Sequence, residues 1–433
     1  MASLIKTRLA MMLNHSFLGP AAMLFISANI ANGANLAFNM IFARLMGPTA
    51  FADLTLLLTL KLGILSFLGA LQFAFAENTA RESRLQVNKS NAYALSWRSL
   101  RISVPIMFVV IASANFISAA LNFSSPSALC ILALAIPFFL PMVIYRGLVQ
   151  GLIDVPKIIL SIQSEWIIRL IGSVMLWQMG FGLVGIALAV GLSIIAGFIF
   201  CVDRQDGPLA RAGTKLPTTL NAKALGVTAM PYLILQAAQV LVLDSDIIIA
   251  KAILTPETAG LVAGLLLIQR VFFFAFLSCS TILQPYVARQ QGEGGSPKEL
   301  LTLLAAIAAI TAIALTLIIP NSGLVVKVML GDNYAALSSI VWISALTGAV
   351  FIVSHLCAIY HIANGQKFAA KIVLGFGVMQ LIVLGVVNHL FPEISLYYYF
   401  IIKLMIQILC AASLLGTLML PPMLLRQKMA AQR

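Results

Sequence analysis

Hydrophobic residues along this chain form long runs that are separated by short polar segments. About 20 apolar residues in a helix are enough to cross roughly 30 Å of hydrocarbon, and runs of this length recur along the whole sequence. The pattern predicts an all-α polytopic membrane protein, and Pro137 and Pro141 are expected to bend its fourth span. We expect twelve membrane-spanning helices, near residues 20–43, 50–76, 102–121, 127–146, 157–177, 182–201, 224–250, 257–286, 300–319, 336–360, 371–390 and 395–420.

Composition supports the membrane class. Of the 433 residues, 61% are hydrophobic and only 9% are charged, and the mean hydropathy is +1.02. Soluble globular domains contain far more charge. The first apolar run is too long for the core of a signal peptide, so we expect it to be retained as a helix.

The distribution of basic residues predicts the orientation of the chain. The net charge is +13, and with the N-terminus inside, twenty of the basic residues fall in cytoplasmic segments. Only Arg44, Lys251 and Lys327 fall outside. This asymmetry follows the positive-inside rule, so both termini are expected to be cytoplasmic. Anionic membrane lipids are the expected partner of the basic inner face, rather than nucleic acid.

Two halves of the sequence resemble each other. "LLLTLKLGILSF" (56–67) aligns with "LLLIQRVFFFAF" (265–276), so that Lys61 corresponds to Arg270. "YRGLVQGLIDVPKIIL" (145–160) similarly resembles "YHIANGQKFAAKIVL" (360–374). Parallel six-helix repeats predict two pseudo-symmetric lobes related by an axis along the membrane normal. The expected domains are an N-lobe (1–201), a cytoplasmic linker (202–223) and a C-lobe (224–433) with a cytoplasmic tail.

Four basic residues lie near the middle of predicted spans, where an unpaired charge costs about 2.5 to 3.5 kcal/mol. Lys61 and Arg270 recur at equivalent positions and have no acid three or four residues away. Equivalent faces of two lobes meet at a central cavity, so the pair is expected to converge there. The alternative is that each cation neutralises an acid such as Asp246 within its own lobe.

The other two mid-span cations have different surroundings. Arg169 follows Glu165 by four residues, which places them on one helix face. They could form a self-neutralised structural pair, or take part in substrate or proton binding. Lys403 has no acid one turn away, so it could line a cavity or pair with an acid elsewhere in the sequence.

Polar residues on two further spans complete the candidate site. Asn29, Asn32, Asn35 and Asn39 fall within about a third of the helix circumference. Such amides could hold helices together or contact sugar hydroxyl groups. Asp246, near Asp244, is a candidate for proton or cation binding, as is Glu165, and coupling to a H+ or Na+ gradient stays open.

Enzyme signatures are missing from the sequence. It contains no HExxH motif, no P-loop and no nucleophile elbow, and its four histidines lack ligand spacing. The five cysteines lie singly in apolar runs, so neither a disulfide framework nor a metal site is expected. We expect a protein that is not an enzyme and needs no cofactor.

Two segments resemble a known family. "ARLMGPTAFADLTLLLTLKLGILSFLGALQFAFAENTARE" (43–82) resembles the first two helices of the polysaccharide transporter family, and "YRGLVQGL" (145–152) is similar to its Gly-x-x-Gln-Gly pattern. This family belongs to the multidrug/oligosaccharidyl-lipid/polysaccharide (MOP) exporter superfamily. The resemblance implies a MATE/MOP-like, V-shaped transporter that flips undecaprenyl-pyrophosphate-linked repeat units. In such flippases basic residues of helices two and eight face the central cavity, and the matching positions are Lys61 and Arg270.

We therefore expect a flippase of the bacterial cytoplasmic (inner) membrane that serves O-antigen, capsule or exopolysaccharide synthesis by alternating access. Its cationic cavity would accept the pyrophosphate of a lipid-linked oligosaccharide, the asparagines would contact sugar, and a polysaccharide polymerase and chain-length machinery are candidate partners. Three alternatives remain open. They are a multidrug or cation antiporter of the same superfamily, a lipid II flippase, and a non-transporting scaffold of an envelope complex.

Overall fold

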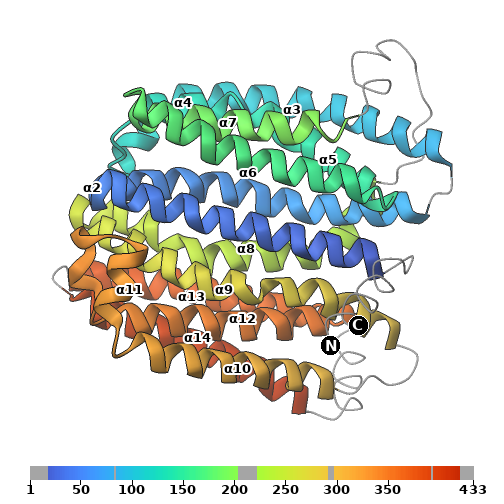
Figure 1. The fold of residues 1–433 in the computed structure, drawn as a ribbon. Coiled ribbons are helices and arrows are strands. Elements are labelled where there is room, and N and C mark those ends of the chain that lie inside the picture. The colour runs from blue at the N-terminus through green and yellow to red at the C-terminus, as the bar shows by residue number, and fades with distance from the viewer. Residues whose placement is uncertain (1–17, 82–83, 203–221, 291–296, 392–393, 420–433) are drawn as a thin grey trace, which may run out of the picture. The chain divides into compact units, whose positions relative to one another are not determined.

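The computed structural model describes residues 18–81, 84–202, 222–290, 297–391 and 394–419, which are helical throughout apart from turns and loops (Figure 1). No strand occurs in these ranges, and the all-α prediction is confirmed. The N-terminal half contains α2 (Leu18–Arg81), α3 (Leu85–Ala120), α4 (Pro126–Ala133), α5 (Ile136–Gly151), α6 (Val155–Gln178) and α7 (Gly182–Ile199). The C-terminal half contains α8 (Ala222–Ile253), α9 (Pro256–Gln290), α10 (Lys298–Ile318), α11 (Ser322–Met329), the 3-10 helix η1 (Asp332–Leu337), α12 (Val341–Ala363), α13 (Phe368–Leu390) and α14 (Leu396–Met419).

The long helix α2 covers the first two predicted spans. It is interrupted at Gly47, whose φ of 71° is left-handed and is followed by Pro48. Glycine adopts this conformation without the steric cost that a Cβ would bring. In the described residues ten helices are long and apolar enough to cross a membrane, or eleven if the bent pair α4 and α5 is one span. The total of twelve spans stays a prediction, as does the side of the termini, which lie outside the described residues.

The fourth predicted span is bent, as its prolines suggest. The axes of α4 and α5 differ by 41°. Pro137 lies in the first turn of α5 and Pro141 lies inside it. Each proline removes a backbone donor, which favours a break at this point.

The helix that contains the third predicted span, 102–121, begins well before that span. α3 already begins at Leu85. Its 36 residues extend about 54 Å at 1.5 Å per residue, so the helix is longer than the hydrocarbon is thick. Its polar N-terminal part buries small polar side chains such as Asn88, Ser96 and Ser99. Hydropathy missed this part because a helix can continue where apolar residues end.

The described helices group into two compact units. The first contains residues up to Asn39 and Leu60–Met230, and the second contains Met40–Thr59 and the chain from Pro231 onward. In the first unit α6 packs against α7, α3 packs against α5, and α4 and α5 also contact α7. The predicted lobe boundaries stay a prediction, because residues 203–221 of the expected linker lie outside the described ranges.

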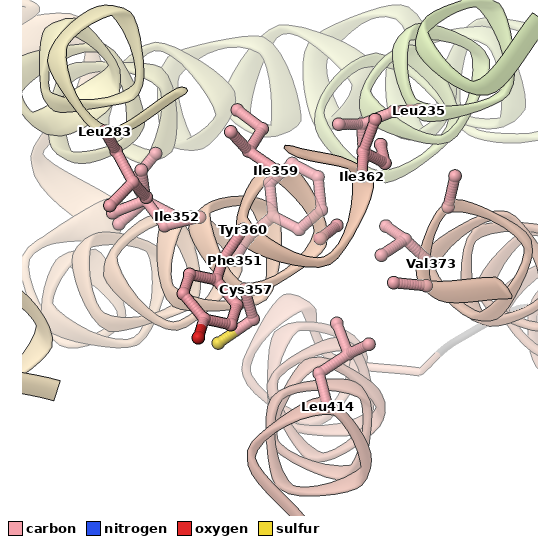
Figure 2. Close-up of a cluster of buried hydrophobic side chains, with 14 of the residues drawn as sticks. Leu235, Leu283, Phe351, Ile352, Cys357, Ile359, Tyr360, Ile362, Val373 and Leu414 are labelled. Atoms are coloured by element: carbon pink, nitrogen blue, oxygen red, sulfur yellow. The ribbon is translucent and has the colours of Figure 1, made fainter. Parts of the chain in front are cut away.

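Helix α12 forms the centre of the second unit. It contacts α9, α10, α13 and α14, and nearly all of its residues are buried. A helix that is apolar on all sides can face either lipid or protein in a membrane, and α12 is enclosed because four helices pack around it. Figure 2 shows the core around it, in which Phe351 and Cys357 of α12 lie among residues such as Leu283 and Leu414.

The segment 40–59 of α2, which includes the kink, packs within the second unit. Every residue from Phe51 to Leu57 is buried. The ring of Phe51 meets Tyr334 of η1 edge-on, with 6.4 Å between the centroids. The backbone of Pro48 lies directly against Gly260 of α9, at a point where any Cβ would overlap it. This contact requires a glycine at position 260.

We predict that Gly260→Ala destabilises the protein, because the new Cβ would collide with the rigid backbone of Pro48. Overpacking of this kind costs about 1 to 3 kcal/mol. The measurement is the apparent melting temperature of the detergent-solubilised protein, followed by size-exclusion chromatography.

The matched control is Gly375→Ala in α13, where the new Cβ would meet nothing within 4 Å. Alanine favours a helix over glycine by about 1 kcal/mol, so this variant should melt at the same temperature or higher. Equal melting temperatures for both variants would contradict the described packing of Pro48 on α9.

Candidate functional site

Lys61 of α2 is paired with Glu165 of α6. The ammonium Nζ of Lys61 donates to Oε1 of Glu165 over 2.9 Å. Lys61 is only 3% exposed, and the side chain of Glu165 is 14% exposed. A buried ammonium requires a counter-charge or good hydrogen-bond acceptors, and Glu165 supplies both.

Arg146 of α5 binds the second oxygen of the same carboxylate. Its Nη2 donates to Oε2 of Glu165 over 3.0 Å, and its Nε donates to the hydroxyl of Ser161 over 2.9 Å. The Ser161 hydroxyl in turn donates to the backbone oxygen of Gly197 in α7 over 2.6 Å. A Cβ at Gly197 would lie 2.9 Å from Nη2 of Arg146. Glycine at this position therefore leaves room for the guanidinium, and the network ties together α5, α6 and α7.

Arg169 lies one turn after Glu165 but does not bind its carboxylate. Both oxygens of Glu165 are occupied by Lys61 and Arg146. The guanidinium of Arg169 instead lies over the ring of Phe38, 5.6 Å from its centroid, and its buried Nε has no hydrogen-bond partner among the described residues. The sequence spacing was compatible with a Glu165–Arg169 pair, but the partners of Glu165 come from other helices.

We refer to Lys61, Arg146, Glu165 and Arg169 as the Glu165 cluster. It holds three cations and one carboxylate, so its charge exceeds neutrality by two positive charges. The side chains of Arg146 and Glu165 are 12% and 14% exposed, so the cluster is not completely enclosed by the protein. This surplus is the main chemical feature of the first unit.

The asparagine stripe lies on α2 in the same unit. Asn39 is 4% exposed; its Nδ2 donates to the backbone oxygen of Asn35 over 2.7 Å, and its buried Oδ1 has no partner among the described residues. Asn29, Asn32 and Asn35 are half-buried. The stripe thus presents amides along a partly covered helix face.

In the second unit Arg270 of α9 is neutralised by Asp244 of α8. Nε of Arg270 donates to Oδ1 of Asp244 over 2.8 Å, and Nη2 binds the same oxygen. Nη2 also donates to the hydroxyl of Thr59 in α2 over 3.0 Å. Lys61 and Arg270 therefore each have a carboxylate within their own unit, which is the alternative that the sequence left open.

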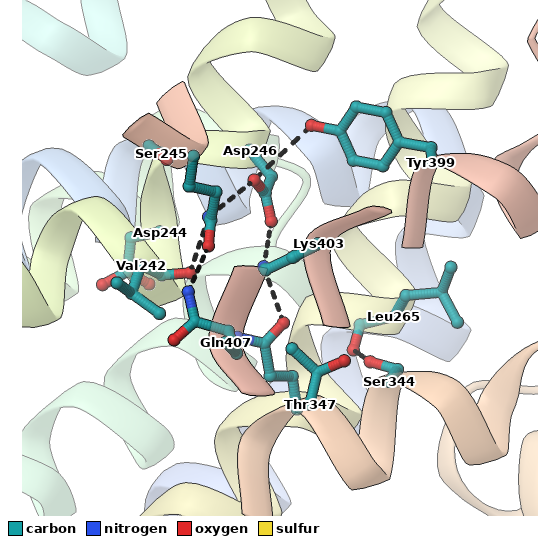
Figure 3. Close-up of polar contacts among 12 residues, drawn as sticks. Val242, Asp244, Ser245, Asp246, Leu265, Ser344, Thr347, Tyr399, Lys403 and Gln407 are labelled. Carbon is teal, nitrogen blue, oxygen red and sulfur yellow. Dashed lines mark hydrogen bonds and ion pairs between the residues drawn. The ribbon is translucent and has the colours of Figure 1, made fainter. Parts of the chain in front are cut away.

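Lys403 of α14 is paired with Asp246 of α8, and both side chains are fully buried (Figure 3). The Lys403 ammonium also donates to Oε1 of Gln269 over 2.7 Å. The second oxygen of Asp246 accepts long hydrogen bonds of 3.4 Å from the Tyr399 hydroxyl and from Nε2 of Gln380. The acid that Lys403 lacks in its own helix is thus supplied by α8.

A third ion pair in the second unit was not expected from the sequence. Nζ of Lys251 in α8 lies 2.6 Å from Oδ1 of Asp53 in α2, and both side chains are at most 3% exposed. With it, the second unit contains three buried acids and three buried cations in one-to-one pairs. Its buried ion pairs carry no surplus charge in the part of the chain that is described.

Comparison with known proteins identifies the fold. No protein-family model matches the sequence, and no curated protein matches it. Solved structures match almost the whole chain. The inward-facing conformation of a multidrug resistance MATE family transporter of the MOP superfamily gives a TM-score of 0.75 at 15% identity, over 92% of this chain and 94% of that chain. The outward-facing conformation of such a transporter gives 0.63 at 15% identity, over 97% of each chain.

The chain has a MATE-like fold.

A third solved structure is also similar to this chain. It is a MOP superfamily transporter from Pyrococcus furiosus, in which a binding pocket of reverse polarity suggests a different function. The TM-score is 0.65 at 14% identity, over 93% of this chain and 95% of that chain. At such identities the likeness establishes the MATE-like fold and leaves the substrate open.

The sequence placed two residues of these ion pairs on the membrane surfaces and not in the protein interior. Arg146 was counted among the basic residues of the inner face, and Lys251 among those of the outer face. Both lie at the ends of predicted spans, and nothing near them in the sequence indicates a buried partner. Among the described residues, no group of three or more His, Cys, Asp or Glu could hold a metal ion.

We predict that Lys403→Met destabilises the protein by about 3 to 5 kcal/mol, because it leaves Asp246 as an unpaired buried charge. The double variant Asp246→Asn/Lys403→Met removes both charges and should recover most of this loss. The measurement is a double-mutant cycle on thermal or denaturant unfolding in detergent.

The control is Lys327→Gln, since the Lys327–Asp332 pair is 66% and 79% exposed and exposed pairs contribute little. It should leave the unfolding transition unchanged. Additive losses from the two single substitutions at Asp246 and Lys403 would show that these side chains do not interact.

Proposed function

We propose that this protein is a transporter that moves a lipid-linked oligosaccharide across the bacterial cytoplasmic membrane, with the diphosphate held at the Glu165 cluster. The polyprenyl chain would remain in lipid and the sugar would contact the polar face of α2. The destination of the glycan would be O-antigen, capsule or exopolysaccharide. A polysaccharide polymerase and its chain-length machinery would be the partners that receive it.

The observation that carries this proposal is the surplus of positive charge in the first unit. A diphosphate between a lipid and a sugar carries about two negative charges, one on each phosphate. The Glu165 cluster has three cations and one carboxylate, so its surplus matches this charge. Charge-assisted hydrogen bonds from guanidinium and ammonium groups to phosphate oxygens are among the strong ones.

Arg169 is the best candidate for direct contact with phosphate. Its guanidinium is outside the ion pairs of the cluster and has a buried Nε without a partner in the described part of the chain. Arginine presents several donors in a planar fork that suits phosphate. Lys61 and Arg146, already fixed by Glu165, would add positive potential beside it.

Arg270 and Lys403 fit a structural role better than substrate binding. Each is bound to its own aspartate, Asp244 and Asp246, and neither adds surplus charge. A role of Asp246 or Glu165 in coupling transport to a H+ or Na+ gradient would require an ion pair to open during the cycle.

The structural neighbours support transport by alternating access. They include MATE transporters in inward-facing and outward-facing conformations. The neighbour with a binding pocket of reverse polarity is consistent with a fold that carries different substrates when its pocket charge changes. Multidrug export remains the second candidate function, because two of the neighbouring structures are of multidrug resistance transporters. An exporter of cationic drugs would, however, be opposed by a net positive cluster.

We predict that Arg169→Gln lowers the rate of lipid-linked oligosaccharide flipping about 10- to 100-fold. The loss of a hydrogen bond to a charged group costs about 1.5 to 3 kcal/mol, which corresponds to this range. The measurement uses proteoliposomes that contain a fluorescent polyprenyl-diphosphate oligosaccharide, and follows its exposure to a membrane-impermeant quencher.

The matched control is Lys157→Gln at the start of the same helix, where Lys157 pairs with Asp154 and is 33% exposed. It should flip the lipid at the wild-type rate. Flipping by Arg169→Gln at the wild-type rate would reject the proposed site. Export of cationic dyes by a protein that does not flip the lipid would instead support the multidrug function.

A further inference from the structure

Trp166 of α6 lies between two contacts that join this helix to α2 in the first unit. Nε2 of Gln163 donates to the hydroxyl of Ser27 over 2.6 Å and to its backbone oxygen over 3.1 Å. Six residues further along α6, Arg169 lies over Phe38. Gln163, Trp166 and Arg169 are three residues apart in turn. Trp166 therefore lies between the two residues of α6 that contact α2 before its kink at Gly47.

The indole ring of Trp166 is held in a fixed orientation. Its Nε1 donates to Oε1 of Gln163, and the amide nitrogen of Gln163 is bound to Ser27. The side chain nevertheless remains partly exposed. Tryptophan is common at membrane interfaces, but Trp166 is near the middle of the 24-residue helix α6, so an interfacial role does not explain its position.

The asparagine stripe borders the same contact. At about 100° per residue, Ser27 and Phe38 differ by only about 20° around the axis of α2, and Asn35 lies roughly 60° to 80° from them. Asn32 lies about 120° to 140° from them, so it faces away from this contact. The described residues supply no hydrogen-bond partner for the side-chain amides of Asn32 and Asn35. Trp166 therefore has Asn35 on the adjoining side of α2 and Arg169 one turn away on its own helix.

We propose that Trp166 is the stacking platform for the sugar ring that is attached directly to the diphosphate, with the Asn35 amide as donor and acceptor for its hydroxyl groups. A sugar ring has an apolar C–H face and a polar rim, which suit an aromatic face edged by an amide. The rise from Trp166 to Arg169 is about 4.5 Å, close to the length of one sugar ring. This assignment rests on the proposed function, because it places the diphosphate at Arg169.

The experiment compares two ligands and two substitutions in nanodiscs, with affinity measured by calorimetry. The ligands are a short-chain polyprenyl diphosphate and the same lipid diphosphate carrying one hexose. Trp166→Leu keeps apolar volume without an aromatic face, and Trp166→Phe keeps the face without the N–H group. We expect Trp166→Leu to weaken binding of the hexose-bearing lipid about five- to tenfold and to leave the bare diphosphate unchanged, while Trp166→Phe retains most of the sugar-dependent affinity.

The outcomes separate this inference from the function on which it rests. Wild-type protein that binds neither ligand overturns the proposed function. Wild-type protein that binds both ligands, with equal losses or no loss for Trp166→Leu, overturns only the role of Trp166. If Trp166→Leu does not fold, the N–H-free Trp166→Phe and the amide variant Asn35→Ala decide it. Asn35→Ala is expected to lose affinity for the sugar-bearing lipid alone.

Discussion

Neutralisation of buried charge is the constraint on which this structure depends. Ionised side chains in the middle of a membrane helix are costly unless a counter-charge and hydrogen bonds accompany them. Helix α8 shows the consequence, because its three buried charged residues each bind a different helix. Asp244 binds α9, Asp246 binds α14 and Lys251 binds α2. Apolar packing in lipid is weakly specific, since lipid tails are as apolar as leucine. These ion pairs can therefore fix which helices surround α8.

The two halves of the chain solve the same electrostatic problem in different ways. Lys61 and Arg270 occupy equivalent positions in the repeat, but the acid of Lys61 comes from α6 whereas the acid of Arg270 comes from α8. The two aligned cations are thus neutralised by acids from helices that do not correspond to each other in sequence. One result is that the second unit is balanced and the Glu165 cluster is not. This difference in charge is what the proposal of an anionic headgroup at the Glu165 cluster depends on.

Hydropathy and repeats in the sequence were sufficient for the helical class and for most helix positions, because the thickness of the bilayer limits the length of an apolar run. The partners of the charged residues were not predictable in the same way. Glu165 is 104 residues from Lys61, and Asp246 is 157 residues from Lys403, so no local spacing relates them. The spacing of four residues on one helix favoured Arg169 as the partner of Glu165. Arg169 instead forms no ion pair with the Glu165 carboxylate, and for this reason the proposed phosphate contact is placed at Arg169.

The path of α2 adds a final constraint. The chain leaves the first unit after Asn39, runs through segment 40–59 of the second unit, and returns to the first unit at Leu60. Any motion of the two units relative to each other must therefore bend α2 near these two positions or release the segment from its contacts with Gly260, Tyr334 and Lys251. The buried Asp53–Lys251 pair makes release costly unless both charges meet water or new partners. Asn39 and Lys61 lie at the two points where the chain changes units, so a bend of α2 there would also displace groups that belong to the proposed site.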